Sequence, residues 1–77
     1  MIDVHVGHQI RRRRRDLGLS QAALAEAIGV RFQQIQKYES GLNQLSAGRL
    51  WAVATALRVS PNYFFEGLAN DQPPEGD

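Results

Sequence analysis

Polar and aromatic side chains crowd one short stretch, residues 31–37, with the sequence RFQQIQK. At about 100° per residue on a helix, Ile35 and Tyr38 would point to one side and most polar side chains to the other. An outward glutamine can bond the edge of an adenine, a lysine suits guanine or a phosphate, and a phenylalanine can touch a thymine methyl group. Polar helix faces are more often simply solvated, so the pattern alone leaves both interpretations open. The candidates for base contacts are Phe32, Gln33, Gln34 and Lys37, and Gln36 is a candidate for a backbone contact.

The preceding residues predict two helices joined by a tight turn. Leu24 and Ile28 form an apolar pair four residues apart. Ala25 is small enough for a second helix to cross closely, and Gly29 can supply the positive φ that such a turn requires. This spacing is typical of a helix-turn-helix, here over about residues 21–40, whose second helix enters the DNA major groove.

The rest of the chain is divided by glycine, serine and proline into further helix-sized segments. Val6, Ile10 and Leu17 recur at helical spacing in the first segment. We expect five short helices in one all-α domain over residues 1–68, and a polar, disordered tail over residues 69–77. The predicted caps are Ser20, Ser46 and Ser60, the predicted helix ends are Gly18, Gly29 and Gly41, and the predicted inward stripe of the fourth helix is Leu50, Val53, Ala54 and Leu57.

Composition narrows the class of protein further. A chain of 77 residues has room for one small domain, which dimerisation would help to stabilise. It has no cysteine, no apolar run of membrane-spanning length and no apolar core of a signal peptide, so we expect a cytoplasmic location and no membrane association. Residues 1–41 carry seven basic and four acidic side chains, whereas residues 42–77 carry two and four. A polyanionic partner would therefore bind only one face of the protein, the one formed by the basic first half of the chain.

Together these stretches resemble the Cro and phage-repressor type of helix-turn-helix, the xenobiotic response element (XRE) family. The resemblance covers about residues 6–68 and rests on VGHQIRRRRRDLGLSQAALAEAIGV, FQQIQKYESG, AGRL and LRVSPNYFFEGL. It implies a compact five-helix, lambda-repressor-like domain that regulates transcription by binding specific double-stranded DNA. The implied form is a repressor that binds a partly palindromic operator as a homodimer, with no cofactor and no small-molecule substrate.

The resemblance also implies roles for single residues. In the family, a glutamine matching Gln21 holds a phosphate at a helix N-terminus, and the loop position of Asn43 touches the DNA backbone. The arginine matching Arg14 pairs with the glutamate matching Glu39. Relatives commonly open the third helix with a capping serine or threonine where this chain has Arg31, so we hypothesise that Arg31 reaches a phosphate instead.

Five consecutive arginines, residues 11–15, form the most conspicuous charge run. A helical projection places Arg11, Arg12 and Arg15 opposite the apolar stripe, while the other two flank it. The run is therefore not one patch. We expect Arg14 to stabilise the fold, Arg11 to supplement contacts with the DNA backbone, and the others to be solvated.

Large apolar side chains near the C-terminus are candidates for binding a partner. The last two helices of so small a domain cannot readily bury five such groups, so we expect some to join two copies of the chain. An alternative is a protein-interaction module, such as an antitoxin or coactivator-like adaptor, that binds its partner through this region or the tail. The dimer-patch candidates are Trp51, Tyr63, Phe64, Phe65 and Leu68.

Residues suited to catalysis or metal binding form no convincing set. Asp3, His5 and His8 could be taken for a metal cluster, but they lie in or before a first helical turn and lack cysteine or a fixed scaffold. No Ser-His-Asp or paired-carboxylate arrangement falls in a plausible pocket of such a short chain. We therefore expect neither a metal site nor an enzyme.

Overall fold

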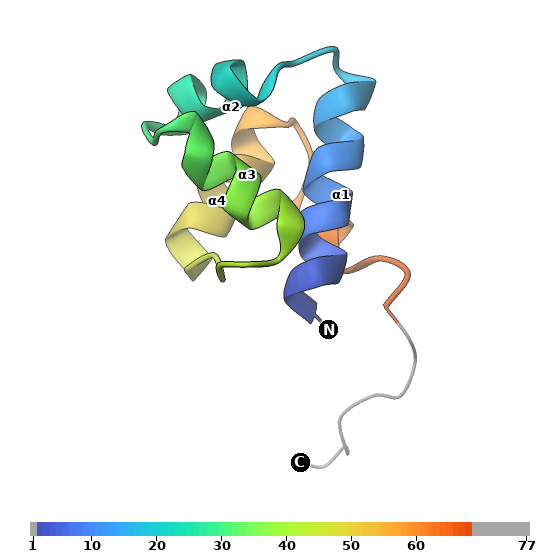
Figure 1. Cartoon of the computed structure of the whole chain (residues 1–77). Coiled ribbons are helices and arrows are strands. Elements are labelled where there is room, and N and C mark those ends of the chain that lie inside the picture. The colour runs from blue at the N-terminus through green and yellow to red at the C-terminus, as the bar shows by residue number, and fades with distance from the viewer. Residues whose placement is uncertain (1, 69–77) are drawn as a thin grey trace.

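The computed structural model describes residues 2–68, and the tail for which disorder was predicted, residues 69–77, lies outside the described residues. Four α-helices are followed by one 3-10 helix, and α3 lies in front of α4 and reaches α1 with its C-terminal end (Figure 1). None of the described helices is long and apolar enough to cross a membrane. The all-α prediction is confirmed. The helices are α1 (Ile2–Asp16), α2 (Gln21–Ile28), α3 (Phe32–Ser40), α4 (Ala47–Ala56) and the 3-10 helix η1 (Pro61–Phe65).

The prediction of a fifth α-helix is wrong in detail, because the last element is a single stretch of 3-10 helix. Pro61 opens it as predicted, and Gly67 follows with a φ of 85°. Its backbone bonds span three residues, from Tyr63 N–H to the Ser60 carbonyl and from Glu66 N–H to the Tyr63 carbonyl. A 3-10 helix is typical of such short pieces, and the left-handed backbone of Gly67 does not allow the segment to continue as a helix.

The predicted helix boundaries agree with the structure at α2, α3 and α4. The hydroxyls of Ser20 and Ser46 accept hydrogen bonds from the backbone N–H three residues on, at 2.9 and 3.0 Å. Gly29 and Gly41 end α2 and α3 with φ of 75° and 80°. Ser60 precedes η1 but its side chain makes no capping bond, so the predicted cap is wrong there.

One apolar core joins all five elements. The predicted stripe of α4 is confirmed, since Val53, Ala54 and Leu57 are buried and Leu50 packs against them. Leu17 is a correction: α1 ends at Asp16, so Leu17 lies in the following turn and keeps 37% of its surface exposed. The largest fully buried side chains are Phe64, Ile10, Leu24, Ile35, Leu57 and Val53.

Helix α1 approaches the end of α3 very closely at Gly7. A Cβ atom at Gly7 would overlap the backbone carbonyl oxygens of Tyr38 and Glu39. Because both obstacles are backbone atoms, any side chain at this position would force the two helices apart. Gly7 therefore sets the distance between the first helix and α3.

Polar side chains of α1 bind the C-terminal part of the domain, which lies beside it in Figure 1. Arg13 Nε donates to the Leu57 carbonyl at 2.9 Å, and Gln9 Nε2 donates to the Tyr63 carbonyl at 3.2 Å. His5 Nε2 lies 2.7 Å from the carbonyl oxygen of Glu66. His5 thus takes part in packing α1 against η1, and no group of three metal-binding side chains occurs among the residues described.

Candidate DNA-binding surface

Helices α2 and α3 form the predicted helix-turn-helix. After Gly29, the Val30 N–H returns to the Ala25 carbonyl at 3.0 Å, which closes the end of α2. Ala25 is almost fully buried, as expected of a small residue at a helix crossing. The turn then leads directly to Arg31, the N-cap position of α3.

The two faces of α3 are divided as the sequence predicts. Ile35 and Tyr38 lie in the core, whereas Gln33 and the other outward residues are exposed. Phe32 keeps 43% of its surface exposed, which is high for an aromatic side chain. The exposed candidates for DNA contact on α3 are Phe32, Gln33, Gln36 and Lys37, and Gln34 is half-buried.

The start of α3 carries no side-chain cap. Arg31 has the extended backbone of an N-cap residue, but its side chain forms no capping hydrogen bond. The first N–H groups of the helix therefore lack the acceptor that a serine or threonine would supply, and the helix dipole makes this end attractive to an anion. The geometry is compatible with the hypothesis that Arg31 contacts a phosphate.

Arg14 and Glu39 form a buried ion pair between α1 and α3. Arg14 Nε donates to Glu39 Oε2 at 2.6 Å, and Nη2 donates to Oε1 at 3.1 Å. The remaining Nη1 donates to the Leu19 carbonyl at 2.7 Å. The two side chains are only 9% and 4% exposed, so water screens this pair poorly. The pair implied by the family resemblance is thus present.

Gln21 is joined to the same pair, which sequence reasoning missed. Its Nε2 donates to Glu39 Oε1 at 3.1 Å from the first residue of α2. An amide nitrogen has two hydrogens, so one remains for another acceptor. Glu39 therefore orients a side chain for which a phosphate contact was predicted. The other two backbone candidates, Arg11 and Asn43, are both exposed.

Arg49 is a further polar residue of this region that sequence reasoning missed. It lies in the first turn of α4, and its Nη1 donates to the Ile28 carbonyl at 3.0 Å. The bond ties α4 to the end of α2, immediately before the turn. From the sequence, Arg49 could be placed between the cap Ser46 and the inward Leu50. That position does not indicate which group its side chain binds.

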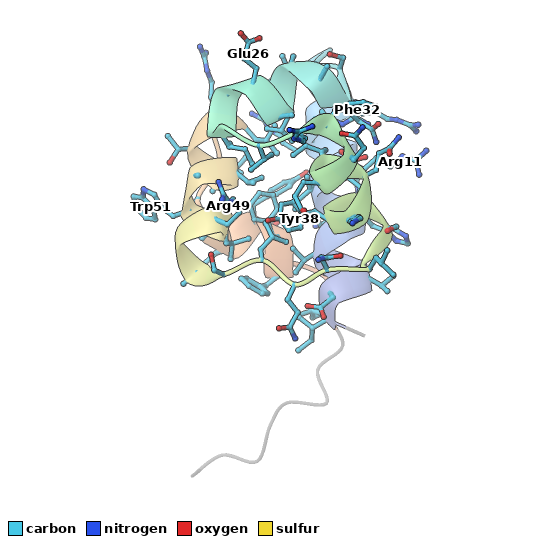
Figure 2. All side chains as sticks on the ribbon, turned by 60° about the vertical axis from the view of Figure 1, so that its left-hand side comes forward. Arg11, Glu26, Phe32, Tyr38, Arg49 and Trp51 are labelled. Atoms are coloured by element: carbon cyan, nitrogen blue, oxygen red, sulfur yellow. The ribbon has the colours of Figure 1, made fainter. Side chains whose placement is uncertain are left out.

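The dimer-patch candidates divide into three groups. Trp51 and Phe65 are exposed, at 66% and 40%, and Trp51 points away from the body of the molecule (Figure 2). Tyr63 and Leu68 are half-buried. Phe64 is a correction: it is fully buried and packs edge-to-face against Tyr63, so it belongs to the core and is not available to a second chain.

Comparison with known proteins places this geometry among transcriptional regulators. A family model described as helix-turn-helix, HTH_3, matches residues 10–64. The chain is 57% identical over 70 residues to the uncharacterized HTH-type transcriptional regulator y4aM of Sinorhizobium fredii, an alignment that covers 91% of this chain and 49% of the relative. The chain therefore spans about half the length of that relative.

Two solved structures show the same fold. The clp gene regulator ClgR from Corynebacterium glutamicum superposes with a TM-score of 0.82 at 28% identity, over 84% of this chain and 69% of the other. The c2 repressor of phage P22, solved in complex with a synthetic operator, superposes with a TM-score of 0.75 at 35% identity, over 80% of this chain and 94% of the other.

Proposed function

The chain belongs to the helix-turn-helix (HTH_3) family, of the Cro and phage-repressor type, and on this premise we propose that it is a sequence-specific regulator that binds double-stranded DNA. One observation carries the proposal. Helix α3 buries Ile35 and Tyr38 and exposes a face with glutamines and a lysine, while its one acidic side chain, Glu39, is buried in an ion pair. Such a face suits the negative potential and the base edges of a major groove.

The mechanism is binding alone. Backbone contacts position the domain without reading sequence, and base contacts then select the site. The candidates for backbone contact are Gln21, Arg31, Gln36, Asn43 and Arg11. The candidates for base contact are Phe32, Gln33, Gln34 and Lys37.

The biological form that we propose is a repressor that occludes a partly palindromic operator as a homodimer, in the cytoplasm of a bacterium or in a phage-infected cell. The similarity in fold to the P22 c2 repressor supports the role of a repressor. The exposed apolar side chains Trp51 and Phe65 support a homodimer, because the contact between two copies would cover them. Two recognition helices joined in this way would lie roughly 34 Å apart, which is one turn of DNA.

Selection of binding sites from random duplexes at fixed salt, followed by sequencing, tests this function. We expect an enriched site with two related half-sites one helical turn apart. An unenriched pool would contradict sequence-specific regulation. If, in addition, the protein co-purified with a partner protein bound through its aromatic C-terminal helix or its tail, the antitoxin or adaptor alternative would replace it.

A further inference from the structure

A shallow hollow lies beside α3, between the helix-turn-helix and the start of α4. Arg31 lines it from the N-cap of α3, Lys37 from the next turns of that helix, and Arg49 from α4. Gln33 and Gln34 add side-chain amides, and none of the described residues around the hollow is acidic. Cations from two different helices therefore converge on one concave site.

Arg49 is held at this hollow before any ligand arrives. Its bond to the Ile28 carbonyl uses one of the five N–H donors of the guanidinium group and leaves others for an acceptor. The side chain is half-buried, and Figure 2 shows it on α4 at the side where Tyr38, which also lines the hollow, faces it from α3. Because Arg49 is already tethered, it loses less rotamer entropy on binding an anion than a free surface arginine would.

The start of α3 adds to the attraction for an anion at the same place. Val30 and Arg31 form part of the lining, and α3 begins there without a side-chain cap. The free N–H groups and the positive end of the helix dipole therefore act together with the cationic side chains.

We propose that this hollow binds one phosphate of the DNA backbone, with Arg49 as its inner cation and Arg31 as its outer one. The proposal rests on the function proposed above. It adds Arg49 to a phosphate contact for which the sequence suggested Arg31 alone. Gln33 and Lys37 belong both to the hollow and to the exposed face of α3. A duplex laid along that face therefore brings its backbone to the rim of the hollow.

The salt dependence of DNA binding tests the proposal. Dissociation constants are measured across a salt series with a duplex obtained from the random-pool selection. Arg49→Gln is expected to reduce the slope of log affinity against log salt by about 0.9, the value for one phosphate, whereas Arg49→Lys keeps the charge and the slope. Arg58→Gln is the matched control, since it removes an exposed charge just beyond the other end of α4 and is expected to leave the slope unchanged.

A second measurement separates a phosphate contact from a structural effect of the tether to α2. Single phosphates of the duplex are replaced in turn by neutral methylphosphonates. At one position, we expect the replacement to weaken binding of the wild type about tenfold and that of Arg49→Gln no more than about twofold. If Arg49→Gln acted only by breaking the hydrogen bond to the Ile28 carbonyl, it would lower the affinity by the same factor for every methylphosphonate duplex.

Three results would overturn the assignment. An unchanged salt slope in Arg49→Gln, with additive effects at every phosphate, would show that the hollow binds no backbone phosphate. Saturation of the Arg49 side-chain NMR signals by micromolar inorganic phosphate without DNA would assign the hollow to a free anion. Failure of the wild type to prefer any duplex would remove the proposed function itself, whereas the first two results leave that function standing.

Discussion

Breaking the ion pair between Arg14 and Glu39 should cost this small domain a large part of its stability. Glu39→Gln keeps the size of the side chain but removes the charge that faces Arg14. Glu39 accepts two hydrogen bonds from Arg14 and one from Gln21, and the pair is almost fully buried. An uncompensated buried charge costs about 3–5 kcal/mol. Small domains have only about 5–15 kcal/mol of stability, so the variant should be close to unfolding.

Thermal and urea denaturation, followed by circular dichroism, measure this effect. At about 4–8 °C per kcal/mol for a domain of this size, Tm should fall by roughly 12–40 °C. The double variant Arg14→Met with Glu39→Leu should recover most of the loss, because an apolar pair of similar volume avoids the desolvation cost. Arg15→Met is the control: it removes an exposed charge from the same run and should change stability by less than about 0.5 kcal/mol.

The double-mutant cycle decides whether the pair acts as a unit. If the effects of Arg14→Met and Glu39→Leu added independently in the double variant, or if Glu39→Gln cost less than about 1 kcal/mol, the reasoning from burial would be refuted. Strong coupling would confirm that the pair links α1 to α3.

Five other substitutions test separate parts of the structure. Gly7→Ala should destabilise the fold by about 1–3 kcal/mol in denaturant titrations, because the added Cβ would overlap backbone atoms of α3. Gly48→Ala should stabilise the fold by about 0.5–1 kcal/mol, because the space around its Cβ in α4 is open. Equal effects at the two glycines would contradict this reasoning. Arg31→Ser should raise stability by about 0.5–2 kcal/mol by restoring a cap. It should also reduce the salt slope of DNA binding, by less than Arg49→Gln does, because Arg49 still faces the phosphate that both arginines share; an unchanged slope would remove Arg31 from the phosphate contacts. Gln33→Ala should lose about 1–3 kcal/mol of discrimination between the selected site and its single-base variants in competition binding, and retained discrimination would exclude Gln33 from base reading. Trp51→Glu should shift the protein towards monomer in sedimentation if this surface forms the dimer; an unchanged mass would place the interface elsewhere.

Much of the local architecture could be predicted from the chain. Helix ends depend on residues within a few positions of one another, so Ser20, Ser46, Gly29 and Gly41 could be identified from type and spacing alone. The buried face of α3 followed from helical periodicity for the same reason. Leu17 misled the prediction, because a periodic pattern does not show that the helix stops one residue earlier.

The candidate site was only partly predictable. The exposed residues of α3 and the lack of a cap at Arg31 can be deduced from one helix. The contacts of Gln21 with Glu39 and of Arg49 with Ile28 cannot, because each joins residues about 20 positions apart on different helices. The family resemblance supplied the pairing of Arg14 with Glu39, which a helical projection leaves undetermined.

By itself, the sequence determined the helical segments, the turn at Gly29 and the side of α3 that faces outward, since these depend on local propensity and on a period of 3.6 residues. Only the tertiary structure decided how the arginines are used. Arg13 and Arg14 donate hydrogen bonds to carbonyl and carboxylate oxygens of distant residues, whereas the outward position of Arg11 already followed from the helical projection. It also buried Phe64 and brought Arg49 beside α3. These outcomes depend on the angles and distances at which the helices cross, and such angles are set by the packing of the whole core.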